Sequence, residues 1–258
     1  MPIRLLSRQR LSIQVLAIGG FVAATVFSSA QELTPEQRAQ LDKIVNVQRN
    51  FDAGRLNSEG THVRAKELSR TENGGIVASY ALYATGFTAR LYDLVTIPIT
   101  PQVQTVDAGA DLQLAEDGQL MDGPNDPRVL IVPDFVPGEP LRLGLLSKDG
   151  KQRAFVTILP NPIKDIDHGC SLNVIRLLPR FEIALVEATG FPPNAELDFK
   201  SDSLGEIHNG KLKTDAAGQV QTAILPFVKG ESKGAIRVAI EAPSCKPHVS
   251  FKWGTTSE

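Results

Sequence analysis

From His62 onward, hydrophobic and polar residues alternate along much of the chain with a period of two. The alternation is clearest near the C-terminus, where Val249, Phe251 and Trp253 are separated by polar residues. Because neighbouring side chains of an extended strand point to opposite faces, this period is typical of strands with one buried face. Clusters of Gly, Pro, Asn and Asp divide the alternating runs into short pieces. The sequence therefore predicts an all-β fold built from antiparallel strands.

The C-terminal part of the chain contains the clearest set of such runs. Turn signals separate them, among them Asn209-Gly210 and Asp215-Ala216-Ala217-Gly218. We predict seven strands here, at 171–177, 181–189, 195–201, 207–213, 218–226, 234–241 and 247–253. Seven short strands in fewer than about one hundred residues are typical of an immunoglobulin-like (Ig-like) sandwich.

The first half of the chain repeats short pieces of the second half in the same order. The matching pairs are Ala84-Thr85-Gly86-Phe87 with Ala188-Thr189-Gly190-Phe191, Gly118-Gln119-Leu120 with Gly218-Gln219-Val220, and Phe135-Val136-Pro137-Gly138-Glu139 with Phe227-Val228-Lys229-Gly230-Glu231. The offset between the copies falls from 104 to 92 along the chain. We therefore predict two copies of one β-fold, with insertions in the first copy at 98–110 and 121–128.

These observations predict an all-β chain with two tandem Ig-like β-sandwich domains, preceded by a signal peptide and a short N-terminal helix. The predicted segments are a signal peptide at 1–30, a helical lead-in or spacer at 31–60, a first sandwich at 61–160, a linker at 161–168, a second sandwich at 169–254 and a tail at 255–258. Pro160 and Pro162 restrict the short linker, so we expect the two sandwiches to form a semi-rigid rod.

The N-terminus has the three parts of a secretory signal peptide. An apolar stretch at 11–27 follows three basic residues, Arg4, Arg8 and Arg10. Small residues then end at Ala30, so cleavage would leave Gln31 as the first residue of the mature protein. The alternative is an uncleaved anchor, because 11–27 lies at the short limit of what spans a bilayer. We favour cleavage and a periplasmic or secreted protein with no stable membrane insertion after it.

The segment 33–51 predicts a helix. Thr34 suits the position before the first turn, Pro35 suits the first helical position, and Gln37 completes a capping box. Leu41, Ile44 and Val45 form a narrow apolar stripe. Such a stripe fits either a docked helix or a frayed spacer, and we favour the spacer.

Cys170 and Cys245 are the only cysteines of the chain. Export would place them in an oxidising compartment, where pairing of two thiols is usual. Cys170 opens the first predicted strand of the second sandwich, and Cys245 lies between its last two strands, so both fall at one end. We predict a disulfide that also fixes how the linker enters this sandwich. The alternative is a Zn or Cu site formed by the same cysteines together with His168 and His248.

Other candidate chemistry is weak. Five carboxylates could bind calcium: Asp165, Asp167, Asp198, Asp202 and Glu206. They do not follow the closely spaced, alternating Asp pattern of a calcium-binding loop, so we interpret them as residues of solvated loops. The apolar turns at 135–140 and 191–194 are interpreted as plugs of the sandwich ends rather than as sticky tips. Motifs of hydrolases, metalloproteases and nucleotide-binding enzymes are missing. We therefore predict no catalytic residues, no metal and no cofactor. A third hypothesis is a hydrolase whose catalytic residues come together from strands distant in sequence.

Composition is ordinary for a globular protein, with 42% hydrophobic residues, 22% charged residues and a formal charge of -2. Outside the extreme N-terminus there is no run of Lys or Arg, which argues against nucleic acid as a partner. Through its strand count, its Ala-Thr-Gly-Phe strand ends and the turn at 215–218, the chain resembles Ig-like modules of exported and surface proteins of bacteria. The resemblance implies adhesion, spacing or binding, with a protein or glycan partner and no enzymatic activity.

Overall fold

The fold is described from a computed structural model, which covers residues 35–71, 77–97, 104–105, 111–133, 135–178 and 183–254. The predicted signal peptide with its Ala30/Gln31 cleavage site, and the predicted tail at 255–258, lie outside the described residues. Within those ranges, no helix combines the length and the apolar character needed to cross a bilayer.

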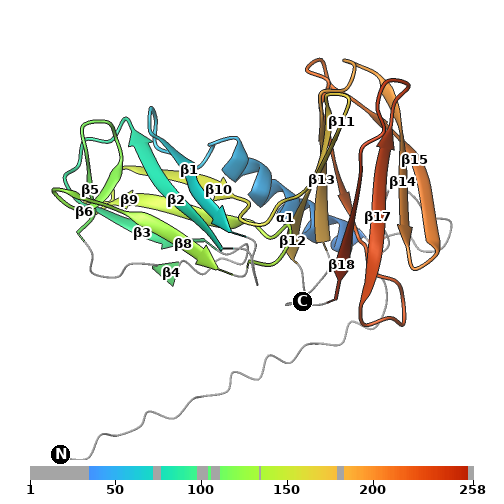
Figure 1. Cartoon of the computed structure of the whole chain (residues 1–258), viewed down its shortest axis with the longest axis horizontal. Helices are drawn as coiled ribbons and strands as arrows, with labels where there is room; N and C mark the ends of the chain where they lie inside the picture. Colours follow the sequence, from blue (N-terminus) through green and yellow to red (C-terminus); the bar gives the residue numbers. More distant parts are fainter. Residues whose placement is uncertain are drawn as a thin grey trace, which may run out of the picture.

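The described chain is one helix followed by strands, as the alternating pattern predicts (Figure 1). The elements are α1 (Pro35–Asp52), β1 (His62–Thr71), β2 (Val77–Thr85), β3 (Tyr92–Thr96), β4 (Gln104–Thr105), β5 (Gln113–Leu114), β6 (Leu120–Gly123), β7 (Asp126–Pro127), β8 (Val129–Pro133), β9 (Leu141–Ser147), β10 (Arg153–Ile158), β11 (Ile163–Asp167), β12 (Cys170–Leu178), β13 (Ile183–Thr189), β14 (Glu196–Ser203), β15 (Glu206–Lys213), β16 (Val220–Ile224), β17 (Gly234–Glu241) and β18 (His248–Trp253). The all-β prediction with one short N-terminal helix is confirmed.

The first sandwich packs the sheet β1-β2-β8 against the sheet β10-β9-β3-β4, with a small additional sheet β5-β6-β7. Its core is a single cluster of buried side chains, among them Tyr80, Leu82, Leu94, Leu112 and Leu143. Alternation explains this core, because the even-numbered residues of β2 point inward and are buried while Val77 and Ser79 point outward.

The second sandwich packs the sheet β11-β12-β13-β16 against the sheet β15-β14-β17-β18. Its core contains Leu172, Val186, Phe199, Val238 and Trp253. All seven strands predicted for this part are present, with boundaries that differ by a few residues. Charged pairs cover the outer face of β14 and β15, where Lys211 lies 2.6 Å from Asp198, so that face is adapted to water.

The two sandwiches share one strand arrangement, as the internal repeat predicts. β2 and β13 occupy equivalent central positions and both end in the repeated Ala-Thr-Gly-Phe sequence. Both glycines have φ of 78° and lie against backbone: a Cβ on Gly86 would collide with the carbonyl oxygen of Gly60, and one on Gly190 with that of Gly169. The repeated glycine is therefore required by the same close approach in each copy.

The insertion predicted at 121–128 is a short hairpin that interrupts one strand position of the sheet. The chain leaves the sheet after Leu120, forms the β6–β7 hairpin, and returns where the Arg128 N–H donates to the Leu120 carbonyl oxygen at 2.9 Å. β8 then pairs with β2 in place of a continuous counterpart of β16. Of the other predicted insertion, 98–110, only the short strand β4 and its pairing with β3 are described.

The predicted linker at 161–168 is wrong as a linker, because most of it is the strand β11. β11 pairs with β12 from Ile163↔Val174 to Asp167↔Cys170 and becomes an edge strand of the second sandwich. Ile163 is buried in the core, whereas Ile166 is 62% exposed. Pro160 and Pro162 stand just before the strand, at a position where a missing N–H costs no ladder hydrogen bond.

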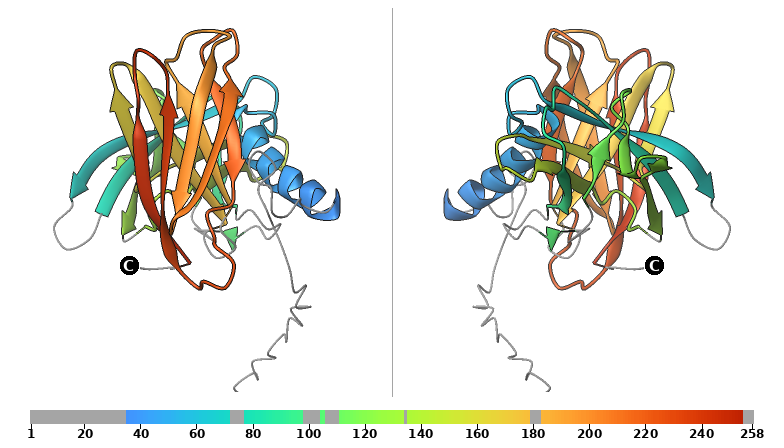
Figure 2. Two further views of the ribbon diagram at one scale, coloured as in Figure 1. Left: turned by 90° about the vertical axis from the view of Figure 1, so that its right-hand side faces the viewer. Right: turned by 90° about the vertical axis from the view of Figure 1, so that its left-hand side faces the viewer.

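The preference for a frayed spacer at 31–60 is also wrong, since α1 is docked on both sandwiches. Figures 1 and 2 show the helix beside the two sandwiches. It contacts β10 of the first sandwich and β12 of the second, and Leu185 of β13 belongs to the same buried cluster as its Leu41 and Val45. Leu41, Val45 and Phe51 are buried, so the narrow apolar stripe is a contact surface. A helix of this length gains its stability from packing of that stripe rather than from propensity alone.

Candidate functional site

The helix α1 acts as a brace, a name used below for Pro35–Asp52, and its first half lies on the second sandwich. Leu41 and Val45 join a buried cluster with Ile175, Leu177 and Leu185. The three strand residues point away from the core of their own sandwich, on the outer face of the sheet β11-β12-β13-β16. That sheet is consequently buried on both faces where the brace covers it.

The second half of the brace lies on the first sandwich. Phe51 packs edge-on against Phe155 of β10, with ring centroids 5.3 Å apart. The fully buried Gln48 accepts a hydrogen bond from Nε of Arg142 on β9 at 2.7 Å and donates to Oγ1 of Thr157 on β10 at 3.3 Å. One helix therefore contacts both sandwiches, with its first half on the second sandwich and its second half on the first.

Charge is buried at this junction. Arg142 is 4% exposed, and burial lowers its pKa to about 10, although the negative charges of Asp52 and Glu139 act to raise it. The guanidinium therefore stays charged at neutral pH. Burial likewise raises the pKa of Asp52 and of Glu139, although the hydrogen bond from Gln48 opposes this for Asp52. Of the three groups, only Arg142 is buried, so removing its partners would leave a buried guanidinium without compensation.

A turn of the first sandwich adds a second bridge. The predicted apolar turn at 135–140 lies against β12, where Gly138 accepts the backbone N–H of Arg176 at 2.7 Å. The Gly138 N–H donates to Asn161 at 2.7 Å, and a Cβ at Gly138 would lie 2.7 Å from Cδ1 of Ile163. This turn therefore contacts the neighbouring sandwich in addition to closing its own.

Replacing Gln48 by leucine will lower the free energy of unfolding by about 2 kcal/mol, because Arg142 then loses the acceptor of its Nε–H while buried. Chemical denaturation measures the change. Asn46→Leu, at an exposed helix position, is the matched control and should change stability little. The double variant Gln48→Leu/Arg142→Met should lose less than the two single losses added together, and strict additivity would show that the pair does not interact.

The predicted disulfide is present. Cys170 and Cys245 are bonded with a Cα–Cα distance of 6.2 Å, and both residues are 2% exposed. Because both sulfurs take part in the bond, the alternative metal set of His168, Cys170, Cys245 and His248 does not form. The bond lies at the end of β12 next to Asp167, whereas Ile163 at the other end of β11 contacts the junction. The expectation that it fixes the entry of the linker is therefore wrong.

Carboxylates beside the disulfide accept hydrogen bonds from the backbone. Oδ2 of Asp167 accepts the N–H of Lys246 at 2.6 Å, and Oδ2 of Asp165 accepts the N–H of His248 at 2.8 Å. These two bonds attach the edge strand β11 to β18 of the opposite sheet and to the turn that precedes it. Of the other calcium candidates, Asp202 accepts the N–H of Gly205 and Asp198 pairs with a lysine. The described residues hold no group of three or more potential ligands placed to share a metal.

Asp167→Asn will make the free energy of unfolding less dependent on pH in the acid range. The hydrogen bond from the Lys246 N–H, followed by contacts with His168, holds the pKa of Asp167 below its ordinary value. Its stabilisation is therefore present above the ordinary pKa and is lost as the pH falls through the folded value. Denaturation midpoints from about pH 7 to about pH 3 should show a gap between wild type and variant that closes on acidification. A gap of constant size would contradict this, and the exposed Glu116→Gln is the control.

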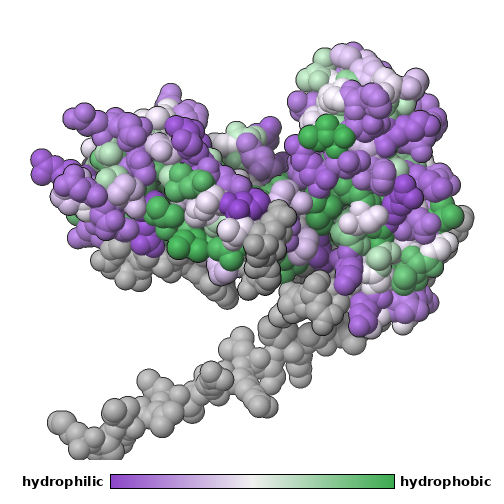
Figure 3. All heavy atoms as spheres, viewed as in Figure 1, coloured by the Kyte–Doolittle hydropathy of each residue, from purple (hydrophilic) through white to green (hydrophobic). Residues whose placement is uncertain are grey.

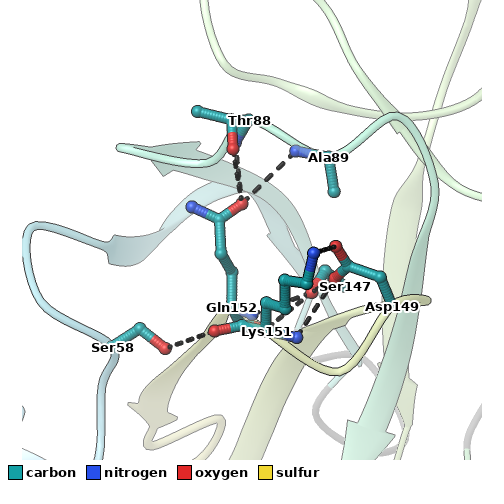
Figure 4. A network of polar contacts seen from close by, with 7 residues as sticks. All are labelled: Ser58, Thr88, Ala89, Ser147, Asp149, Lys151 and Gln152. Carbon is teal, nitrogen blue, oxygen red and sulfur yellow. Dashed lines mark hydrogen bonds and ion pairs between the residues drawn. The ribbon is translucent and has the colours of Figure 1, made fainter.

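A hollow of about 890 Å³ lies at the end of the first sandwich, between the β2–β3 connection and the β5–β6 turn. Its floor includes Tyr92, whose hydroxyl donates to the Ala89 carbonyl oxygen at 2.5 Å. Figure 4 shows Gln152 of the β9–β10 turn reaching toward this connection, where its Oε1 accepts the N–H of Thr88 at 2.8 Å. The hollow is thus built from fixed turns, with charges of both signs among its lining residues.

The comparisons with known proteins do not assign the chain to a family. No protein-family model matches the chain, and no curated protein matches it. Among solved structures, one described as "Biofilm associated protein - BSP domain" is similar at 10% sequence identity and a TM-score of 0.19. The match covers 82% of this chain and 54% of that structure, so the chain spans about half its length. The likeness is too weak to carry a conclusion about activity or partners.

The disulfide could be predicted from the sequence, whereas the contacts of the brace with the two sandwiches could not. Gln48 and Arg142 are 94 residues apart and belong to no motif, so spacing does not connect them. A signal did exist in β12 and β13, where Val174-Ile175 and Leu185-Val186 break the alternation with adjacent apolar residues. Strands that are apolar on both faces indicate a covered outer face.

Proposed function

We propose that the protein is exported and works outside the cytoplasm as a non-enzymatic, two-sandwich unit that spaces or binds other components of the cell envelope. The observation that carries this proposal is the brace, which buries residues on both sandwiches and ties Gln48 to Arg142 across the junction. A connected pair of sandwiches suits a protein that holds two partners at a set separation, because motion between domains is the default without such an interface.

Two further features support export. The buried disulfide fits proteins that fold in an oxidising compartment. The basic, apolar and small-residue order of the first thirty residues fits a cleaved secretory signal. A catalytic role has no support from a nucleophile–base pair among the described contacts, and His168 is engaged with Asp167.

Fractionation of producing cells, followed by sequencing of the protein N-terminus and thiol titration, tests the proposal. We expect the protein in the fraction outside the cytoplasm, with Gln31 as its first residue and no thiol that reacts after denaturation. A cytoplasmic protein that keeps Met1 and two reactive thiols would overturn it. Retention in the membrane with the N-terminus intact would support the anchored alternative and correct the processing step only.

A further inference from the structure

The turn that carries the repeated Gly-Gln pair meets its neighbouring strand at a different place in each sandwich. In the second sandwich the Gly218 carbonyl oxygen accepts the N–H of Phe191, the last residue of the repeated Ala-Thr-Gly-Phe segment, at 3.2 Å. In the first sandwich the Gly118 carbonyl oxygen accepts the N–H of Ala84, the first residue of that segment, at 2.8 Å. A Cβ on either glycine would collide with the carbonyl oxygen of the same donor residue. The Gly118 turn is therefore drawn back from the end of β2.

In the second sandwich this turn closes against the connection that follows β13. Oγ1 of Thr214 accepts the N–H of Ala195 at 2.8 Å and donates to the Pro192 carbonyl oxygen at 2.7 Å. The Asn194 N–H donates to the Asp215 carbonyl oxygen at 3.0 Å. The turn and the connection of the second sandwich are thus joined directly.

In the first sandwich the corresponding connection is held from its other side. Oε1 of Gln152 accepts the N–H of Thr88 at 2.8 Å (Figure 4), and its Nε2 donates to the Gly86 carbonyl oxygen at 3.0 Å. Phe87 is only half-buried, whereas its counterpart Phe191 is 4% exposed. The hollow of about 890 Å³ lies between this connection and the drawn-back turn.

This space is named the tip hollow below and is lined by residues 84–92 and 113–118. Figure 1 places β5 and β6 at the end of the first sandwich that lies farthest from the second sandwich. In Figure 3 hydrophilic residues predominate on the visible face of that end. The hollow of about 640 Å³ in the second sandwich is lined by Arg49 and Glu187, among others, and by no residue of the connection at 190–195. The opening between connection and turn is therefore particular to the first copy.

The lining of the tip hollow combines apolar and polar side chains. Its half-buried members are apolar and include Phe87, Leu91 and Leu114. The Phe87 ring packs edge-on against Tyr92 with centroids 5.3 Å apart, so its position is fixed. The exposed side chains of the lining are Thr85, Thr88, Arg90, Gln113, Glu116 and Asp117. A matching ligand has an apolar face and several hydrogen-bonding groups around it.

Charge narrows the class of ligand. The lining carries two carboxylates, Glu116 and Asp117, and one guanidinium, Arg90, so its balance is negative and disfavours an anion. None of the three forms an ion pair with another described residue. An entirely apolar ligand would remove water from these groups and give no hydrogen bonds in return.

The backbone of the tip hollow offers little to an extended peptide. The N–H groups of Thr88 and Ala89 donate to Gln152, and the Ala115 N–H donates to the Gln119 carbonyl oxygen. A peptide that adds as a strand needs such groups free. Recognition therefore falls to side chains, whose hydroxyl, amide, carboxylate and guanidinium groups together suit a ligand rich in hydroxyls.

We propose that the tip hollow binds a neutral saccharide. The C–H face of a sugar ring lies on Phe87, its hydroxyls donate to Glu116, and they accept from Arg90 and Gln113. Each sugar hydroxyl both donates and accepts, so it satisfies carboxylate and guanidinium groups alike. The inference rests on the proposed binding role and names the class of ligand.

Binding of the full, oxidised chain to an array of neutral oligosaccharides tests the proposal, with heparin fragments and peptides on the same array. We expect binding to a neutral oligosaccharide, with a Kd of about 1 mM or tighter when the free sugar is titrated by calorimetry. Gln113→Ala and Glu116→Ala should each weaken it roughly tenfold, because each removes a side chain that hydrogen-bonds hydroxyls. Glu206→Ala, at an exposed position of β15, is the matched control and should leave the Kd unchanged.

Four results would overturn the proposal. They are no binding to any neutral saccharide, binding only to heparin or peptides, a Kd unaffected by both rim variants, and an equal loss in Glu206→Ala. Thermal melts followed by circular dichroism show that each variant is folded. Export is measured separately by fractionation, so an exported protein that binds no neutral saccharide loses this inference and keeps the proposed function.

Discussion

Replacing Val45 by aspartate will lower the free energy of unfolding by about 3 kcal/mol, one of the two largest losses that we expect from a small change in this chain. Val45 is 5% exposed and packs in the cluster with Ile175, Leu177 and Leu185. A carboxylate there has no basic partner in that cluster, so the first half of the brace must leave the sheet. Denaturant titration followed by fluorescence of Trp253, the only tryptophan, measures the loss.

The control for this change is Asn46→Asp, which introduces the same charge at the next, exposed position of the helix. It should alter stability by less than about 0.5 kcal/mol. Because each sandwich has its own core, the Val45 variant should keep its β-structure while the uncovered sheet face binds a hydrophobic dye. Equal stability of the two variants would show that the brace is not docked in solution.

Replacing both cysteines by alanine will lower the free energy of unfolding by about 4 kcal/mol in the chain-entropy account of disulfides. Cys170 and Cys245 are 75 residues apart in sequence, so the bond closes most of the second sandwich into one loop. Opening it increases the conformational freedom of the unfolded chain and leaves two small gaps in the core. Trp253 again reports the transition, because it belongs to the same core cluster.

Reduction of the wild-type protein is the internal control for the cysteine variant. A reducing agent should destabilise the wild type by a similar amount and should leave the double alanine variant unchanged. A wild-type protein that is equally stable with and without reductant would contradict the expected contribution. Two reactive thiols in the unreduced protein would contradict the bond itself.

Local pattern was enough to predict the sandwiches. Alternation such as that of Val249, Phe251 and Trp253 records which side chains face a core, and this is decided by residues adjacent in sequence. The repeated Ala-Thr-Gly-Phe segment was equally informative, because a glycine with positive φ and a close backbone neighbour is needed at the same place in both copies. The pairing of the cysteines followed from their places at strand ends.

The junction could not be predicted in the same way, because its contacts connect elements that are distant in sequence. A narrow stripe such as Leu41 and Val45 fits a free helix as well as a docked one, and only the outer face of β12 and β13 decides between them. The segment at 161–168 was misread because its two prolines and its charges are typical of a linker. An edge strand tolerates both, since one side of it has no pairing to lose.

The two copies differ in how their equivalent sheet faces are covered. In the second sandwich, the outer face of the sheet containing β13 is covered by the brace, while the equivalent face of the first sandwich exposes Val129 and Ile131 beside basic residues. The β6–β7 excursion at 121–128 also belongs to the first copy, whereas hollows lie beside the corresponding turns of both copies.

The central claim is that the brace holds the two sandwiches in one arrangement, and a distance measurement between them tests it most directly. Spin labels on cysteines introduced at Glu116 of the first sandwich and Lys252 of the second, both exposed, report the separation by pulsed electron resonance. We predict one narrow distance distribution in the wild type and in Asn46→Asp, and a broad one in Val45→Asp. A broad distribution in the wild type, or an equally narrow one in Val45→Asp with the helix released, would contradict the account.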